Sequence, residues 1–306
     1  MRRDVPDFQL RSAQDQALLG EEGTHRLLAA GRAWDLAPVL RAGGAVIFPH
    51  TSIAVCGHQV AAAVHACLDS GARRVLAIGV LHALTQELEE ARVRVANGED
   101  PAREPTWGIQ GPGLHGREEW RAEFSLSHFL FLWKQETARR GISGPEVVVR
   151  YPSLAGGRPD LLPGIAELQE IAQEAVVVAT MDPFHHGIGY GDLPNEALTP
   201  TEGGLELARQ SIADGLALLQ GGEYWNYNRH CVQAKSDGRD VGQVLRYLRG
   251  PQKGQILDLI ADDMSAAYDK PAPTWVAGAL ITLHFRGLKC MESAKAEFPF
   301  QLREQK

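Results

Sequence analysis

The sequence predicts a layered αβα domain with a central, largely parallel or mixed sheet. Short apolar segments rich in β-branched residues alternate with longer segments of helical periodicity, which is typical of α/β chains. The apolar segments are nearly continuous, as strands covered on both faces tend to be. The chain has 306 residues, of which 44% are hydrophobic and 23% charged, so it can bury a large core. Because the sequence contains no evident linker or internal repeat, we expect a single domain over residues 1–306.

The predicted elements follow in order along the chain. Residues 1–33 have a weak helical pattern and form an N-terminal arm, residues 34–284 form the core, and residues 285–306 form a tail. Five apolar segments of the core are predicted strands: 43–50, 73–82, 146–154, 174–182 and 275–285. Three segments with helical spacing that end at glycine are predicted helices: 57–71, 125–141 and 202–222. Residues 97–116 are rich in glycine and proline and predict a long loop, a kind of segment that often forms a functional lid.

The overall charge and the cysteine content exclude several classes of protein. A net charge of -7 and a pI near 5.9 argue against a nucleic-acid partner, because nucleic-acid-binding proteins usually carry a basic patch. The N-terminal stretch "MRRDVPDFQL" lacks the apolar core of a signal peptide, and no segment reaches the length of a membrane span. The cysteines are widely spaced and fit a reducing compartment better than a disulfide framework: Cys56, Cys67, Cys231 and Cys290. We therefore expect a cytoplasmic protein that binds neither nucleic acid nor a membrane.

Histidines follow three of the predicted strands. His50 ends the first strand segment, His82 ends the second, and the adjacent His185 and His186 follow "AVVVATMDPF". In open α/β sheets ligands bind beyond the carboxyl ends of the strands, so we expect at least two of these histidines to share a metal ion. A carboxylate would complete an iron site, and Asp237 in "KSDGRD" is a candidate, although an Asp-Gly pair is also typical of a turn or a helix N-cap.

Six blocks of the sequence resemble a known family. The segments "FPHTSIAVCG", "GVLH", "EFSLSHFL", "MDPFHHG", "DGRDVGQVL" and "TWVAGALITLH" are similar, in the same order, to blocks of the Memo family, which is related to the LigB-type class III extradiol dioxygenases. The resemblance covers about residues 45–284. It implies a Memo/LigB-like fold and places His50, His82, Asp182 and His185 at positions of the family's site.

The chain also departs from the Memo pattern at two places. Asp237 stands where the family has its site cysteine, so the resemblance implies two histidines and one carboxylate, a set associated with oxygen-activating non-haem iron. In the third block Glu123 and Ser125 remain, whereas Phe124 and Ser127 occupy two of the family's polar positions. We therefore expect a pocket rebuilt around a different, more apolar substrate.

These observations lead to the hypothesis of an Fe(II)-dependent dioxygenase that acts on a small phenolic, catecholic or aminophenol-like substrate. Iron would be held by His50, His82 and Asp237, His185 would act as the acid/base, and Asp182 would orient a histidine. The expected partners are the aromatic substrate and dioxygen, and assembly into a homo-oligomer is left open. The residues with weaker claims to the substrate pocket are Glu123, Ser125, His128, His186, Tyr190 and His230.

Two other hypotheses remain open from the sequence. In one, His50, His82 and His185 bind zinc, Asp237 lies outside the ligand set or acts as a base, and the protein is a metallohydrolase. In the other, the chain is a non-catalytic Memo-like protein with a binding or redox-signalling role. The metal that the protein binds would distinguish among the three hypotheses.

Overall fold

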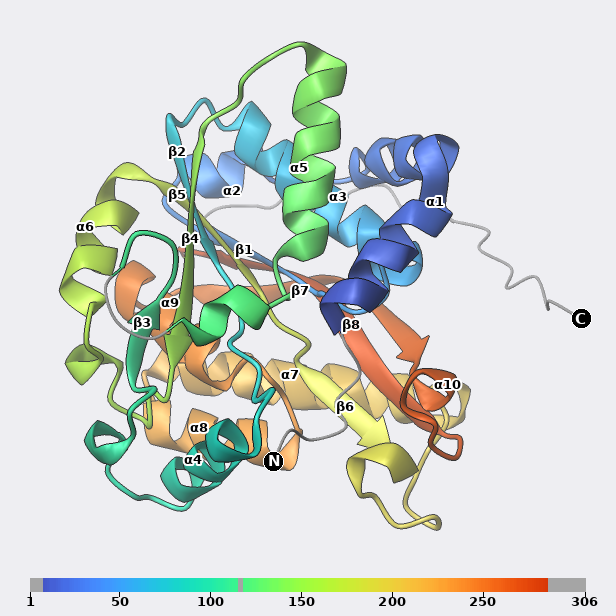
Figure 1. Ribbon diagram of the computed structural model, residues 1–306, viewed down its shortest axis with the longest axis vertical. Helices are drawn as coiled ribbons and strands as arrows, with labels where there is room; N and C mark the ends of the chain where they lie inside the picture. Colours follow the sequence, from blue (N-terminus) through green and yellow to red (C-terminus); the bar gives the residue numbers. More distant parts are fainter. Residues whose placement is uncertain (1–7, 115–117, 286–306) are drawn as a thin grey trace, which may run out of the picture.

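The computed structural model describes residues 8–114 and 118–285, so the tail after residue 285 lies outside the described residues. The described chain forms one eight-stranded sheet with helices on both sides (Figure 1). The strands are β1 (Ala45–Phe48), β2 (Arg74–Ile78), β3 (Gly108–Gln110), β4 (Glu146–Ser153), β5 (Val176–Thr180), β6 (Phe184–Gly187), β7 (Lys253–Asp263) and β8 (Thr274–His284).

The helices connect these strands and flank the sheet. The α-helices are α1 (Phe8–Gly31), α2 (Ala37–Arg41), α3 (Ile53–Asp69), α4 (Gln86–Ala96), α5 (Ser127–Arg140), α6 (Ile165–Glu174), α7 (Gly204–Gly221), α8 (Tyr224–Gln233), α9 (Arg239–Arg249) and α10 (Ser265–Tyr268). The short 3-10 helices are η1 (Pro101–Arg103), η2 (Glu119–Ala122), η3 (Pro159–Leu161), η4 (Ile188–Tyr190) and η5 (Pro200–Glu202). All five predicted strands and all three predicted helices are present, with ends that shift by a few residues.

The sheet is mixed, with a parallel centre. Its strand order is β3-β4-β2-β5-β1-β8-β6, and β7 pairs with β8 outside this path. The four central strands β4, β2, β5 and β1 are parallel, so their carboxyl ends lie at the same edge. β3, β8, β6 and β7 join by antiparallel pairing. The predicted α/β class with a largely parallel or mixed sheet is therefore confirmed.

Successive side chains of each strand point to opposite faces of the sheet, so the core is divided into two layers. On β1, Val46 and Phe48 pack into one cluster, while Ala45 and Ile47 pack into the other. The first cluster includes side chains of α1, α3 and α5, and the second includes side chains of α6, α7 and α9. Both layers are built from fully buried aliphatic residues, so burial of apolar surface stabilises both faces of the sheet.

β8 has an edge that two strands share. β7 pairs with β8 along almost its whole length, from Trp275 to His284. β1 pairs with the carboxyl-terminal part of β8 and β6 with its amino-terminal part, so both must lie on the opposite edge. The end of β1 and the start of β6 therefore lie on either side of a short gap, near Gly278, where this edge of β8 pairs with neither strand.

The N-terminal segment is a long helix that packs on the core. α1 contacts α3 and α5, and it is kinked at Gly20, which has a φ of 63° that favours glycine. Near its end, a Cβ at Gly31 would lie 2.6 Å from the Cβ of Ala61, so this close approach of α1 and α3 requires glycine. The helical prediction for residues 1–33 is thus confirmed from residue 8 onward.

Three strands and part of the predicted loop differ from the sequence expectation. β3, β6 and β7 were not predicted, and residues 97–114 contain η1 and β3, which pairs with β4. Three of the four cysteines, Cys56, Cys67 and Cys231, are buried free thiols, and Cys290 lies outside the described residues. None of the helices in the described part of the chain is both long and apolar enough to cross a membrane.

A buried carboxylate on α5 links this helix to Arg32, just after α1, and to His65 on α3, whose Nδ1 lies 3.4 Å from Glu136 Oε1. Glu136 is fully buried and lies 2.6 Å from the Nε atoms of Arg139 and Arg140 and 3.1 Å from Arg32 Nη2. Burial raises the pKa of the Glu136 carboxyl, but Arg139 and Arg140 outweigh it and lower that pKa from 4.5 to about 2. The ionised form is therefore favoured by the folded state.

We expect Glu136→Gln to lower the free energy of unfolding by about 2 kcal/mol near neutral pH, because Arg139 would lose its charged partner, whereas Arg32 and Arg140 would keep Asp69. The contribution of a carboxyl with a lowered pKa is present above its unfolded pKa and is lost as the pH falls through its folded pKa. The difference between wild type and variant should therefore shrink as the pH falls from 4.5 to about 2. Urea unfolding across this range measures it, and a difference that is independent of pH would contradict the assignment.

Candidate metal centre

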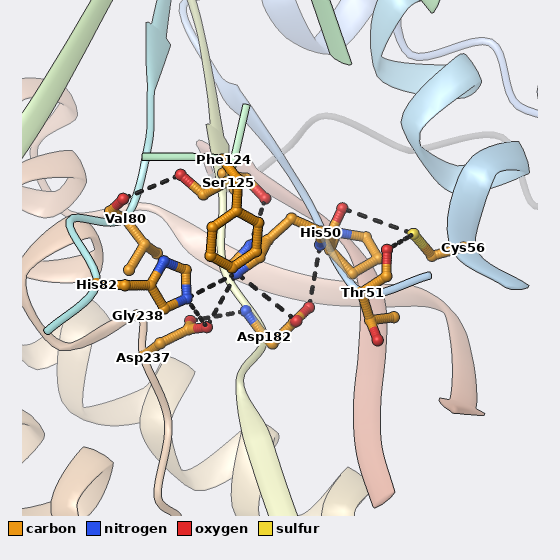
Figure 2. A network of polar contacts seen from close by, with 12 residues as sticks. His50, Thr51, Cys56, Val80, His82, Phe124, Ser125, Asp182, Asp237 and Gly238 are labelled. Atoms are coloured by element: carbon orange, nitrogen blue, oxygen red, sulfur yellow. Dashed lines mark hydrogen bonds and ion pairs between the residues drawn. The ribbon is translucent and has the colours of Figure 1, made fainter. Parts of the chain in front are cut away.

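The predicted metal ligands and catalytic residues meet at the carboxyl edge of the parallel strands. His50 follows β1, His82 follows β2, and Asp182 follows β5, while Asp237 lies in the connection between α8 and α9. Because the parallel strands end at one edge, side chains that are far apart in the sequence converge there (Figure 2). His185, on β6, lies across the short gap beside β8. We call these five residues the His/Asp cluster.

Three atoms of the cluster face one another at close range. His50 Nε2 lies 3.3 Å from His82 Nε2 and 3.1 Å from Asp237 Oδ2. His82 Nε2 lies 3.6 Å from the same oxygen. Ligand atoms about 2.1 Å from one metal ion are about 3.0–3.4 Å apart in octahedral or tetrahedral geometry. The side chains of His50, His82 and Asp237 therefore fit a single divalent ion with little movement, and these three residues are one of the groups able to hold a metal.

Both histidines are fixed through their other ring nitrogen. His50 Nδ1 lies 3.0 Å from Thr180 Oγ1, at the end of β5. His82 Nδ1 lies 2.9 Å from Glu123 Oε1, and the backbone N–H of His82 donates to Glu123 Oε2 at 2.6 Å. Such partners orient an imidazole so that its Nε2 points at a metal.

Glu123 supports His82 from a buried position. Its side chain is fully buried, and Oε1 also accepts hydrogen bonds from the backbone N–H groups of Phe124 and Ser125. The Ser125 hydroxyl in turn donates to the carbonyl of Val80 (Figure 2). Glu123 and Ser125 thus lie behind His82 and hold its loop, whereas the sequence placed them as weak candidates for the substrate pocket.

Close packing positions Asp237. Its Oδ1 accepts the backbone N–H of Asp182 at 2.8 Å, which leaves Oδ2 directed at the two histidines. The next residue, Gly238, packs against Met181, and a Cβ there would lie 2.6 Å from the methionine sulfur. The Asp-Gly pair is thus explained by this close approach, and Asp237 is both a loop residue and a member of the cluster.

The charges of the cluster are strongly coupled. Burial alone would lower the pKa of His82, but Glu123 and Asp237 outweigh it and raise that pKa to about 10. Burial likewise opposes a charged His50, yet Asp182 and Asp237 raise its pKa. Burial raises the pKa of Asp182 to about 6, whereas the pKa of Asp237 is lowered because His50 and His82 outweigh its burial. The carboxylates thus favour positive charge at this position, which a bound cation would supply in place of protons.

His185 differs from the other histidines of the cluster. Burial lowers its pKa to about 4, so the ring is neutral, and its Nδ1 is buried without a hydrogen-bond partner in the described structure. The ring lies edge-on to Tyr190, with centroids 4.8 Å apart. Asp182, His185 and Asp237 form a second group whose ligand atoms lie within 4.8 Å of one another. A neutral imidazole with a free nitrogen can accept a proton or bind a metal.

A pocket with about 510 Å³ of empty space, partly open to solvent, surrounds the cluster. Its walls come from α1, from the strand ends and from the segments before α5 and α10. The lining residues outside the cluster are Phe8, Arg11, Ser12, Asp15, Thr51, Ser52, Phe124, His128, Met264, Tyr268 and Val276. The contribution of α1 was not expected from the sequence.

The remaining pocket candidates divide between the wall and other parts of the fold. His128 lines the pocket. Tyr190 is not among the lining residues, but its ring packs against His185, which is. His186 points to the other face of β6, where its Nδ1 lies 3.0 Å from Asp192 and its Nε2 accepts the N–H of Leu198. His230, on α8, lies 3.4 Å from Ser211 Oγ on α7. Neither His186 nor His230 lines the pocket.

The geometry of the pocket therefore offers two histidines and a carboxylate to one ion, with a neutral histidine beside them. The assignment of these residues rests on the contacts within the chain and on the sequence patterns described above. No protein-family model matches the sequence, and no curated protein matches it.

Proposed function

We propose that the protein is a non-haem Fe(II)-dependent dioxygenase. The observation that carries this proposal is the approach of His50 Nε2, His82 Nε2 and Asp237 Oδ2 to within 3.1–3.6 Å of one another. Two histidines and one carboxylate on one side of an ion, with open positions opposite, are typical of oxygen-activating iron(II). The six sequence blocks similar to the Memo family support the proposal, and we further propose a Memo/LigB-like fold and a cytoplasmic location.

The substrate is proposed to be a small phenol, catechol or aminophenol. The pocket wall next to the metal is aromatic: the Phe124 ring stacks on His82 with centroids 4.6 Å apart and an interplanar angle of 19°. Such a wall favours a flat ring over a flexible chain. Bound iron would bring the substrate and dioxygen together and pass electrons between them.

The chain's own residues would orient the substrate and move protons. His185 lines the pocket and is neutral, so its ring can accept the proton of a substrate hydroxyl. Asp182 accepts the backbone N–H of His50 at 3.1 Å and keeps the loop after β1 in place. Phe124 and α1 restrict the access of water to one side of the cluster.

The experiment that tests the proposal is metal titration under anaerobic conditions, followed by oxygen uptake. We expect the purified chain to bind about one Fe(II) and then to consume dioxygen only when a phenolic compound is present. Catechol and 2-aminophenol serve as the first probes, with cyclohexane-1,2-diol as the control that keeps two adjacent hydroxyls but lacks the aromatic ring. Failure to bind iron, or oxygen uptake that is the same with and without the probes, would contradict it.

A zinc-dependent hydrolase remains the second candidate, because His185 forms a second group able to hold a metal with Asp182 and Asp237, although the ligand atoms of His50, His82 and His185 do not all lie within 4.8 Å of one another. The dioxygenase hypothesis and the hydrolase hypothesis predict different effects of His185→Ala. If His185 handles protons, the variant should keep its iron and lose oxygen uptake. If His50, His82 and His185 together bind zinc, the variant should lose the metal, and the wild type should bind zinc without any oxygen uptake.

A further inference from the structure

The N-terminal half of α1 brings a cation to the pocket of the His/Asp cluster. Phe8, Arg11, Ser12 and Asp15 all line this pocket, although they lie far from the other lining residues in sequence. Ser12 Oγ lies 2.6 Å from Ser127 Oγ at the start of α5, which fixes the helix against the core. The side chain of Arg11 is therefore held at the pocket by a helix with its own tertiary contacts.

Within the described chain, Arg11 has only a weak ionic partner. Its Nε lies 4.0 Å from Asp15 Oδ2, at the limit of an ion pair, and its side chain is 34% exposed. Burial raises the pKa of the Asp15 carboxyl, Arg11 lowers it, and Asp262 raises it further. The ion pair between Asp15 and Arg11 is therefore weak, and the N–H groups of the planar guanidinium can donate to a second acceptor.

An aromatic stack joins Arg11's helix to the metal-binding histidine. Phe8 stacks on Phe124 with centroids 4.9 Å apart and an interplanar angle of 20°, and Phe124 stacks on His82. Tyr268 lies edge-on to Phe8, with centroids 6.0 Å apart. A flat substrate with its donor atoms on the metal would thus lie along this wall with its far side towards α1.

We propose that Arg11 binds an anionic substituent, such as a carboxylate, on the aromatic substrate and thereby selects phenolic acids over their uncharged parents. The inference deepens the proposed function and rests on it for the aromatic class of the substrate. The carboxylates of the pocket wall explain why a cation is needed, since Asp15, Asp182 and Asp237 would repel an anion. A guanidinium matches a carboxylate with two parallel hydrogen bonds, which gives both affinity and direction.

The test compares matched pairs of compounds by anaerobic calorimetry on the Fe(II)-loaded protein. The pairs are catechol with 3,4-dihydroxybenzoate, and 2-aminophenol with 2-amino-3-hydroxybenzoate. We expect the acid of at least one pair to bind the wild type about 10-fold or more tightly than its parent, as for a charge-assisted hydrogen bond. Arg11→Gln should reduce that preference to about 2-fold or less without changing the affinity for the parent, and Arg11→Lys should restore part of it.

The control variant is Arg26→Gln on the same helix, where the arginine is 72% exposed and pairs with Glu22. This variant should keep the wild-type preference. Iron occupancy is measured first, so that a wild type that binds no iron contradicts the proposed function and, with it, the role of Arg11. If the loaded wild type binds iron but prefers no acid, or if Arg11→Gln keeps the preference, the role of Arg11 alone is overturned.

Discussion

Replacing Asp237 with alanine is expected to weaken Fe(II) binding by about 100-fold or more. The carboxylate is the only negative ligand in the proposed set, and even the loss of an outer hydrogen-bond partner costs about 10–100-fold in metal affinity. Asp237 Oδ2 lies 3.1 Å from His50 Nε2 and 3.6 Å from His82 Nε2. Within the described chain, the next carboxylate from His50 Nε2 is that of Asp182, which lies farther away, with its Oδ2 at 3.7 Å. Anaerobic titration with Fe(II) measures the affinity, and oxygen uptake should fall with it.

The variant Asp237→Asn separates the two functions of this side chain. An asparagine keeps an oxygen that can accept the N–H of Asp182, so the loop should stay folded while the negative ligand is lost. Asp258→Asn is the matched control, because Asp258 also pairs with a histidine, at 2.9 Å from His58 Nε2, but does not line the pocket. Full iron occupancy in Asp237→Ala would refute the assignment of the ligands, whereas reduced occupancy in the Asp258 control would point to a general loss of structure.

Part of the His/Asp cluster was accessible to sequence reasoning because of a general property of parallel sheets. His50 and His82 follow apolar segments that could be recognised as buried strands, and strands that run in parallel bring their ends together. Asp237 is different, because an Asp-Gly pair is common in turns, so the sequence offered it only as a candidate and the comparison with the Memo blocks favoured it as a ligand. Its position depends on α8, α9 and Met181, contacts that no local pattern encodes.

Other features depend on long-range packing and could not be predicted. The weak helical pattern of residues 1–33 did not indicate that α1 packs beside the strand ends and lines the pocket with Arg11. β7 was missed because Asp258 and Asp262 interrupt its apolar pattern, although each carboxylate has a partner in the fold. The same limit applies to His185 and His186: β6 was not predicted, yet its pleat directs one histidine into the pocket and the other away.

Removal of Glu123 is expected to have the largest effect on stability. The carboxylate accepts hydrogen bonds from the His82 backbone and from Phe124 and Ser125, and it also contacts the His82 ring. We expect Glu123→Ala to lower the free energy of unfolding by about 3–5 kcal/mol, because buried N–H groups would lose their acceptor and His82 its negative partner. Urea unfolding of the metal-free protein measures this loss.

The milder variant Glu123→Gln tests the effect on the metal separately from the effect on folding. A glutamine fills the same space and can still accept some of these hydrogen bonds, but it lacks the charge that holds His82, so iron affinity should fall by about 10–100-fold in a folded protein. Glu118→Gln is the surface control, since Glu118 is 63% exposed and pairs only with Arg121 within the described structure, and it should change stability by less than about 0.5 kcal/mol. If Glu123→Gln is folded and binds iron like the wild type, the orientation of His82 does not depend on this carboxylate. The hydrogen bond between His50 Nδ1 and Thr180 Oγ1 would then be the support of this kind on which the proposed metal site depends.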